Sequence, residues 1–163
     1  MNALSRRELL PLLRQLLGIL LLWAAVSKLA NPTEFLGSVY AYQLPLPHGF
    51  LQAAAVVLPW VELLVGLLLL AGFWPQTSLL IVTALMGLFV LATGQAWLRG
   101  LDISCGCFNL KVFGLTEAMP GLVRFLESVA FAFFRNLFLA VLAGWLLRNK
   151  LAQTGPLPAF QPD

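Results

Sequence analysis

Hydrophobic residues fall into four long runs along the chain, at about residues 9–30, 51–73, 75–98 and 128–148. A helix needs about 20 predominantly apolar residues to cross the hydrocarbon core of a bilayer. Backbone polar groups inside lipid must be hydrogen-bonded internally, which favours helices. The pattern therefore predicts an all-α integral membrane protein, a four-transmembrane-helix bundle. The fourth run is the least uniform, because Arg135 lies within it.

Prolines separate these runs. Asn31-Pro32 ends the first helix, since the residue before a proline resists the helical conformation. Pro75 suits the first turn of the third helix. We expect residues 1–150 to form one transmembrane domain and residues 151–163, which contain three prolines, to form a flexible tail. The third loop is long, and an interfacial helix is predicted within it, before the fourth span.

The lysines and arginines indicate an orientation in a bacterial inner membrane. The N-terminal segment contains Arg6, Arg7 and Arg14, and Arg148 and Lys150 lie at the C-terminal flank, whereas residues 31–50 contain no Lys or Arg. Basic residues accumulate in cytoplasmic segments. Both termini are therefore predicted to be cytoplasmic, and the third loop extracytoplasmic. Lys28 and the three later runs favour a retained first helix over a cleaved signal peptide.

Composition agrees with a lipid environment. The chain of 163 residues is 60% hydrophobic and 10% charged, with a mean hydropathy of +0.88. Soluble domains have about a quarter of their residues charged. The net charge of +3 is not gathered into a basic stripe, so we expect the partner to be the lipid bilayer and no nucleic acid to bind.

The third loop contains the two cysteines of the chain, in the sequence Cys105-Gly106-Cys107. Cysteines two residues apart can approach the Cα separation of about 4.4–6.8 Å that a disulfide requires, and glycine between them tolerates the unusual dihedrals of so small a ring. A short ring stabilises the fold little, and a strained disulfide exchanges readily. If the two cysteines form a disulfide, redox exchange explains it better than stabilisation of the fold does.

Other interpretations of the cysteines stay open. Free cysteines are often buried and inert. Tetrahedral zinc needs three or four ligands, and His48, the one histidine, belongs to the other outer loop, so no metal site is predicted. The two thiolates would suit copper(I).

Several charged residues lie within the apolar runs, and Glu62 among them needs a partner. Glu62 falls in the middle of the second run, where a carboxylate should face the bundle. Lys28 and Arg14 are the candidate partners, but counting residues from the span ends separates each from Glu62 in depth. A direct bond to Lys28 requires an offset helix start or a long lysine reach. We favour a structural ion pair over a proton- or quinone-associated site beneath the dithiol.

Arg135 is expected close to the outer interface. Its side chain could snorkel outward to the head groups. Alternatively, its positive charge could favour the thiolate form of a nearby cysteine, which requires the third loop to fold back over the fourth helix.

The chain resembles the MauE/DoxX-like redox-associated membrane proteins from about Leu9 to Leu147. The resemblance is carried by Arg14 and Gly18, Ser27-Lys28-Leu29, Tyr40, Leu58-Pro59-Trp60-Val61-Glu62-Leu63-Leu64-Val65-Gly66, Cys105-Gly106-Cys107-Phe108 and Arg135-Asn136. Its most specific element is the Cys-Gly-Cys-Phe loop. The family often continues with glycine where this chain has Asn109, although asparagine also tolerates a left-handed turn.

The resemblance implies a role in disulfide formation or thiol relay for periplasmic proteins, since MauE-type proteins are linked to methylamine utilisation and to maturation of a disulfide-rich dehydrogenase subunit. Cys105 and Cys107 would be catalytic, with the supporting residues Gly106, Phe108, Arg135, Lys28 and Glu62. The partner would be a periplasmic thiol protein or a thioredoxin-like domain. No cofactor motif is evident, and a quinone is a candidate electron acceptor. The main alternative is a non-enzymatic assembly or scaffold factor with structural or metal-holding cysteines. A transporter would require inverted repeats, and none is visible.

Overall fold

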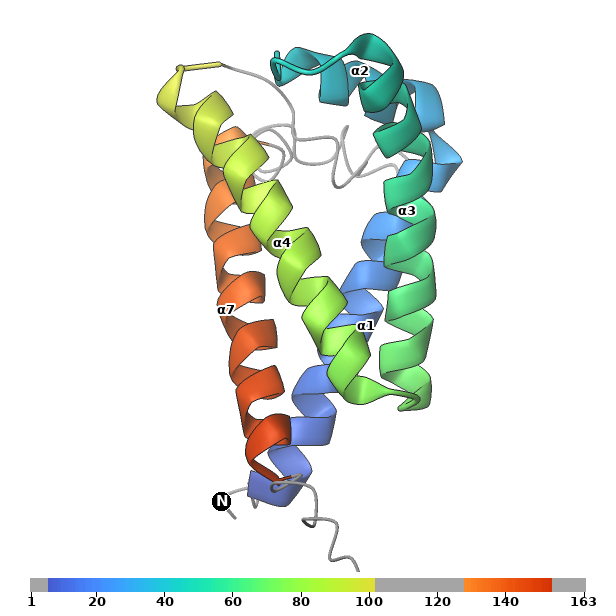
Figure 1. The fold of residues 1–163 in the computed structure, drawn as a ribbon, viewed down its shortest axis with the longest axis vertical. Coiled ribbons are helices and arrows are strands. Elements are labelled where there is room, and N and C mark those ends of the chain that lie inside the picture. Colours follow the sequence, from blue (N-terminus) through green and yellow to red (C-terminus); the bar gives the residue numbers. More distant parts are fainter. Residues whose placement is uncertain (1–5, 102–127, 154–163) are drawn as a thin grey trace, which may run out of the picture.

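The structure is a computed structural model, and it describes residues 6–101 and 128–153. The described residues form the helices α1 (Arg6–Ala30), α2 (Pro32–Ala41), α3 (His48–Ala71), α4 (Pro75–Leu98) and α7 (Val129–Gln153) (Figure 1). Four of them are long and apolar enough to cross a membrane, over Leu9–Ala30, His48–Ala71, Pro75–Leu98 and Val129–Asn149. The predicted all-α fold with four membrane-spanning helices is confirmed.

One helix and several helix boundaries differ from the sequence-based expectation. The helix α2 lies in what was expected to be a loop between the first two spans; Pro32 opens it, and it buries Phe35 and Val39. The helix α3 begins at His48, three residues before the apolar run. The helix α7 continues to Gln153, so the first residues of the expected tail are helical. The interfacial helix expected before the fourth span falls outside the described residues.

The bundle consists of two closely packed helix pairs, α1 with α3 and α4 with α7, while α3 and α4 contact each other over a smaller region. Two glycines allow α1 and α3 to approach closely. A Cβ atom added to Gly18 would lie 3.1 Å from the Gly66 carbonyl oxygen, and one added to Gly66 would lie 3.2 Å from that of Gly18. Small residues at such crossings are typical of membrane helices, because backbone proximity increases van der Waals contact.

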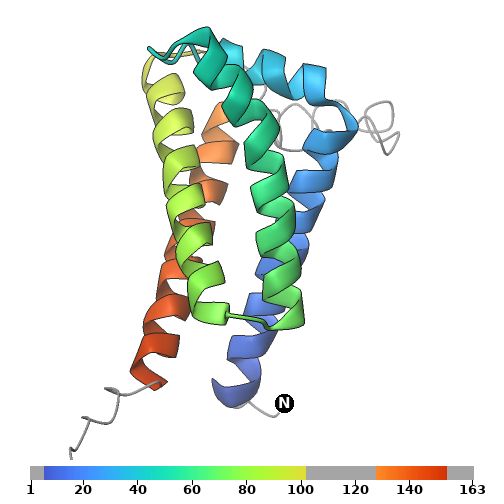
Figure 2. The same ribbon diagram turned by 45° about the vertical axis from the view of Figure 1, so that its right-hand side comes forward.

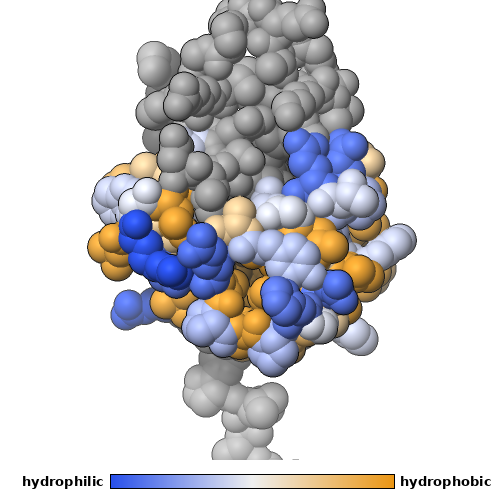
Figure 3. Space-filling view, turned by 90° about the horizontal axis from the view of Figure 1, so that it is seen from above, coloured by the Kyte–Doolittle hydropathy of each residue, from blue (hydrophilic) through white to orange (hydrophobic). Residues whose placement is uncertain are grey.

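The two ends of the bundle are distinct. The start of α1, the end of α7 and the turn between α3 and α4 lie at one end, and α2 lies across the other, where α4 ends and α7 begins (Figures 1 and 2). Seen from the α2 end, hydrophilic and hydrophobic residues are interspersed (Figure 3). There the exposed Arg99 guanidinium donates hydrogen bonds to the Gln43 carbonyl oxygen at 3.1 Å and to its side-chain oxygen at 3.2 Å. The first and last described residues therefore lie at the same end of the bundle, opposite α2 (Figures 1 and 2).

Candidate functional site

A buried ion pair joins α1 to α3. The Lys28 Nζ atom donates hydrogen bonds to both carboxylate oxygens of Glu62, at 2.7 Å to Oε1 and 2.6 Å to Oε2. Each of the two side chains is 1% exposed. Of the two partners considered for Glu62, the structure brings Lys28 to the carboxylate. Arg14 lies at the opposite end of the bundle, against Gly72.

Lys28 and Glu62 form this pair, although counting residues from the ends of their spans places the two at different depths in the membrane. Relative to the Gly18–Gly66 crossing, Lys28 lies about 15 Å and Glu62 about 6 Å towards the α2 end, at 1.5 Å per residue. Side chains tilt towards the N-terminus of their own helix. Because α1 and α3 are antiparallel, Lys28 points down towards Glu62 and Glu62 points up towards Lys28. The start of α3, carried beyond the end of α1 by α2, supplies the required offset (Figure 2).

Two polar residues of α7 adjoin the pair. Lys28, Glu62, Arg135 and Asn136 line one small cavity of about 190 Å³, and we call these four residues the polar cluster. Arg135 Nη2 donates a hydrogen bond to Asn136 Oδ1 at 3.4 Å. Arg135 therefore lines this cavity within the bundle, which differs from the outward snorkelling that was one of the two possibilities considered for it. The cysteines lie outside the described residues, so the second possibility, an effect of Arg135 on their thiolate form, stays a prediction.

Asn136 is 3% exposed, and its amide nitrogen Nδ2 has no hydrogen-bond partner among the residues that the structure describes. A buried donor without an acceptor costs about 1–3 kcal/mol. The amide nitrogen belongs to a residue that lines the cavity of the polar cluster.

Two aromatic rings flank the ammonium group of Lys28. Its Nζ atom lies 5.4 Å from the ring centroid of Phe35 on α2 and 5.1 Å from that of Phe89 on α4. Both distances fall within the range of about 6 Å for a cation–π contact. The lysine thus contacts or pairs with residues of three other helices, which places the charge at a junction of the bundle.

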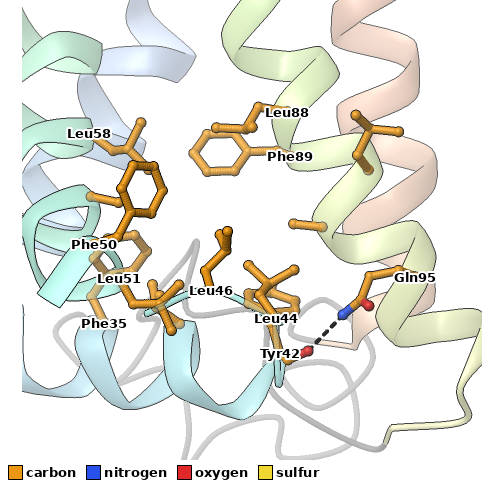
Figure 4. A pocket seen from close by; sticks show the side chains of 14 residues that line it. Phe35, Tyr42, Leu44, Leu46, Phe50, Leu51, Leu58, Leu88, Phe89 and Gln95 are labelled. Atoms are coloured by element: carbon orange, nitrogen blue, oxygen red, sulfur yellow. Dashed lines mark hydrogen bonds between the residues drawn. The ribbon is translucent and has the colours of Figure 1, made fainter. Parts of the chain in front are cut away.

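The same two rings line an apolar groove of about 440 Å³ between α3 and α4 (Figure 4). Leu44 and Leu46 point into it from the segment between α2 and α3. Gln95 adds a polar side chain to the lining, and its Nε2 atom donates a hydrogen bond to the Tyr42 carbonyl oxygen at 2.6 Å (Figure 4). We call it the α3–α4 groove; it is lined by Phe35, Val39, Tyr42, Leu44, Leu46, Phe50, Leu51, Ala54, Leu58, Leu88, Phe89, Leu91, Ala92 and Gln95.

The other residues assigned to the site from the sequence are placed as follows. Cys105, Gly106, Cys107 and Phe108 lie outside the described residues. His48 packs edge to face against the ring of Tyr40 on α2, at 5.6 Å between centroids.

Sequence reasoning missed the α3–α4 groove and the role of the aromatic rings, because apolar lining residues look like any other membrane-helix residues. Asn136 belonged to the family pattern but was given no role. A buried asparagine next to Arg135 in an apolar run was the available signal.

Four membrane-spanning helices around a buried polar cluster define a small polytopic membrane protein. The family model for the methylamine utilisation protein MauE matches residues 6–149. The chain is 41% identical to the methylamine utilization protein MauE of Paracoccus versutus, over 93% of this chain and 89% of the relative. Its identity to the protein of the same name is 33% in Paracoccus denitrificans, over 92% of this chain and 70% of the relative, and 40% in Methylophilus methylotrophus, over 71% and 59%. No solved structure matches.

The chain belongs to the MauE family. The family resemblance seen in the sequence is therefore confirmed.

Proposed function

We propose that this chain is an inner-membrane maturation factor of methylamine utilisation, which supports disulfide formation or thiol–disulfide relay in extracytoplasmic proteins through Cys105 and Cys107. Membership of the MauE family, whose named relatives are methylamine utilization proteins, is the observation that carries the proposal. The Cys105-Gly106-Cys107 sequence supplies the chemistry.

In the proposed exchange, a thiolate of the partner attacks the Cys105–Cys107 disulfide and forms a mixed disulfide with one of the two cysteines. A second partner thiolate then resolves the mixed disulfide. The partner leaves with one disulfide and two fewer electrons, and Cys105 and Cys107 become two thiols. An oxidant must then remove two electrons and two protons to reset the pair.

The arrangement of the described helices supports exchange near one membrane surface. Leu101 and Ser128, which flank the segment that carries the cysteines, lie at the α2 end of the bundle (Figure 1). The basic residues near the start of α1 and the end of α7 favour the α2 end as the extracytoplasmic one.

The test is a redox titration of the cysteine pair in native membranes. Membranes containing the full chain are equilibrated in a series of thiol–disulfide buffers and trapped with a maleimide large enough to shift the band in a gel. We expect a reversible two-electron transition between a doubly labelled and an unlabelled form. The variants Cys105→Ser and Cys107→Ser should each abolish it, and Ser104→Ala should leave it unchanged.

Accessibility and maturation complete the test. A membrane-impermeant maleimide should label the reduced pair from the extracytoplasmic side of intact spheroplasts. Two cysteines that stay reduced and unreactive at every potential would overturn the exchange mechanism. If the double serine variant still supported maturation of the partner, the non-enzymatic scaffold function would replace it.

A further inference from the structure

The α3–α4 groove and the polar cluster are adjacent and together form one amphiphilic site. Leu58 lines the groove and Glu62 lies one helical turn further along α3, in the polar cluster. Phe89 lines both spaces. Met86, one turn before Phe89 on α4, lines the cavity of the polar cluster. The groove and the cavity thus share the ring of Phe89, and the cavity, although mostly apolar, contains the four residues of the polar cluster.

The groove opens towards lipid. Four of its lining side chains are among the exposed large hydrophobic residues of the membrane bundle: Leu46, Phe50, Leu88 and Leu91. Leu88 and Leu91 belong to the span Pro75–Leu98, so their exposed faces meet acyl chains. The volume of about 440 Å³ is within the range of about 300–1,000 Å³ for small-molecule sites. An apolar molecule can therefore enter from the bilayer without passing through water.

The polar cluster determines what kind of head group fits. Asn136 Nδ2 is a buried donor with no acceptor among the described residues. The charged side chains that line the cavity there are the cations Lys28 and Arg135 and the carboxylate of Glu62, a net charge of +1 among the described residues. Donors and net positive charge suit a head group whose oxygens accept hydrogen bonds and gain electron density on reduction.

We propose that this site binds a lipid-soluble quinone, with its tail in the α3–α4 groove and a ring carbonyl oxygen directed at Asn136. The inference rests on the proposed function and deepens it, because it names the oxidant. The thiols of Cys105 and Cys107 lose two electrons and two protons and form one S–S bond. The quinone takes up both electrons and both protons and leaves the site as a hydroquinone.

The test uses the full chain in phospholipid nanodiscs, titrated with decylubiquinone while tryptophan fluorescence quenching is measured. Wild type should give saturable binding. Ala54→Phe, which fills the groove, should weaken binding about tenfold or more. Val56→Phe is the matched control, since Val56 is 63% exposed on the same helix and does not line the groove, and its affinity should equal that of wild type.

Asn136 is tested separately. Asn136→Leu removes the donor and should weaken binding about tenfold, as expected for the loss of one hydrogen bond. Thermal unfolding of each variant in the same nanodiscs checks that it folds, and Asn136→Gln, which keeps the amide, should retain more affinity than Asn136→Leu. Equal affinity in wild type, Ala54→Phe and Asn136→Leu would show mere partitioning into lipid and overturn the site. A co-purified phospholipid that Ala54→Phe releases and decylubiquinone does not displace would also overturn it.

This site and the proposed function fail in different ways. The variant with serine at both Cys105 and Cys107 should bind decylubiquinone as wild type does. Quinone binding without a redox transition of the cysteines would overturn the exchange mechanism and leave the quinone site intact. A reversible cysteine transition in a chain that binds no quinone would overturn the site and leave the exchange mechanism intact.

Discussion

Replacing Glu62 by glutamine should strongly destabilise the bundle. The Lys28 ammonium is held by both carboxylate oxygens, at 2.7 and 2.6 Å, and each side chain is 1% exposed. Removing one partner of a buried pair leaves an uncompensated charge, which costs about 3–5 kcal/mol. An exposed pair would contribute only about 0–1 kcal/mol. The two cation–π contacts of Lys28 do not replace the carboxylate, since each contributes about 0.5–2 kcal/mol and is already present.

The assay is equilibrium unfolding in mixed micelles of a mild detergent and increasing SDS, followed by tryptophan fluorescence. Glu62→Gln and Lys28→Met should each lower the free energy of unfolding by about 3–5 kcal/mol, and the double variant Lys28→Met/Glu62→Met should recover most of that loss. Gln52→Ala, at an exposed polar position of α3, is the control and should change it by less than about 0.5 kcal/mol. A loss below about 1 kcal/mol for Glu62→Gln, or a double variant as unstable as the singles added together, would refute the buried-pair reasoning.

Three other substitutions can be measured in the same unfolding assay. Gly66→Ala should destabilise by about 1–3 kcal/mol, because the new Cβ would lie 3.0 Å from a leucine side chain of α1, whereas Gly87→Ala, with nothing within 4 Å, should be neutral or slightly stabilising; equal effects would contradict the close crossing. Gly72→Ala should cost about 1–2 kcal/mol, since Gly72 ends α3 at a φ of 77°, and no loss would mean that the turn can be made otherwise. Gln95→Leu removes the hydrogen bond to the Tyr42 carbonyl oxygen and should cost about 1 kcal/mol, and a stabilised variant would contradict that contribution.

The four spans could be predicted because lipid imposes a strong constraint on sequence. A membrane helix must be apolar around its whole circumference for about 20 residues, and no other element of a small protein needs such a run. The helix α2 was missed because it is only ten residues long and begins with a proline directly after the first span. Its stability comes from packing Phe35 and Val39 against Leu51 and Ala55 of α3, a tertiary contact that local pattern does not encode.

The candidate site was predictable in part. Glu62 and Lys28 were recognised because a charge in an apolar run needs a partner. The choice of Lys28 over Arg14 depended on the height of the Gly18–Gly66 crossing and on the direction of side-chain tilt in antiparallel helices. Neither follows from residue counts.

The α3–α4 groove could not be predicted at all, because it arises where two tightly packed helix pairs separate. Its lining residues are leucines, phenylalanines and alanines that would be equally suited to a filled core or a lipid-facing surface. The relative position of α3 and α4 distinguishes them. These two helices contact each other over a small region near their connecting turn and are separated at the α2 end (Figure 1).

The position of the ion pair argues for more than helix locking. Replacing a buried ion pair by apolar residues of similar volume is often neutral or stabilising. If the pair served only to hold α1 against α3, leucine or methionine at the two positions would do so equally well. Here the pair lies beside a second, half-buried cation, Arg135, and a buried amide donor, Asn136, next to a groove that opens to lipid. Each of these groups adds a desolvation cost that helix packing alone does not require. A head group that accepts hydrogen bonds would offset that cost, and for this reason we assign the polar cluster to ligand binding as well as to the fold.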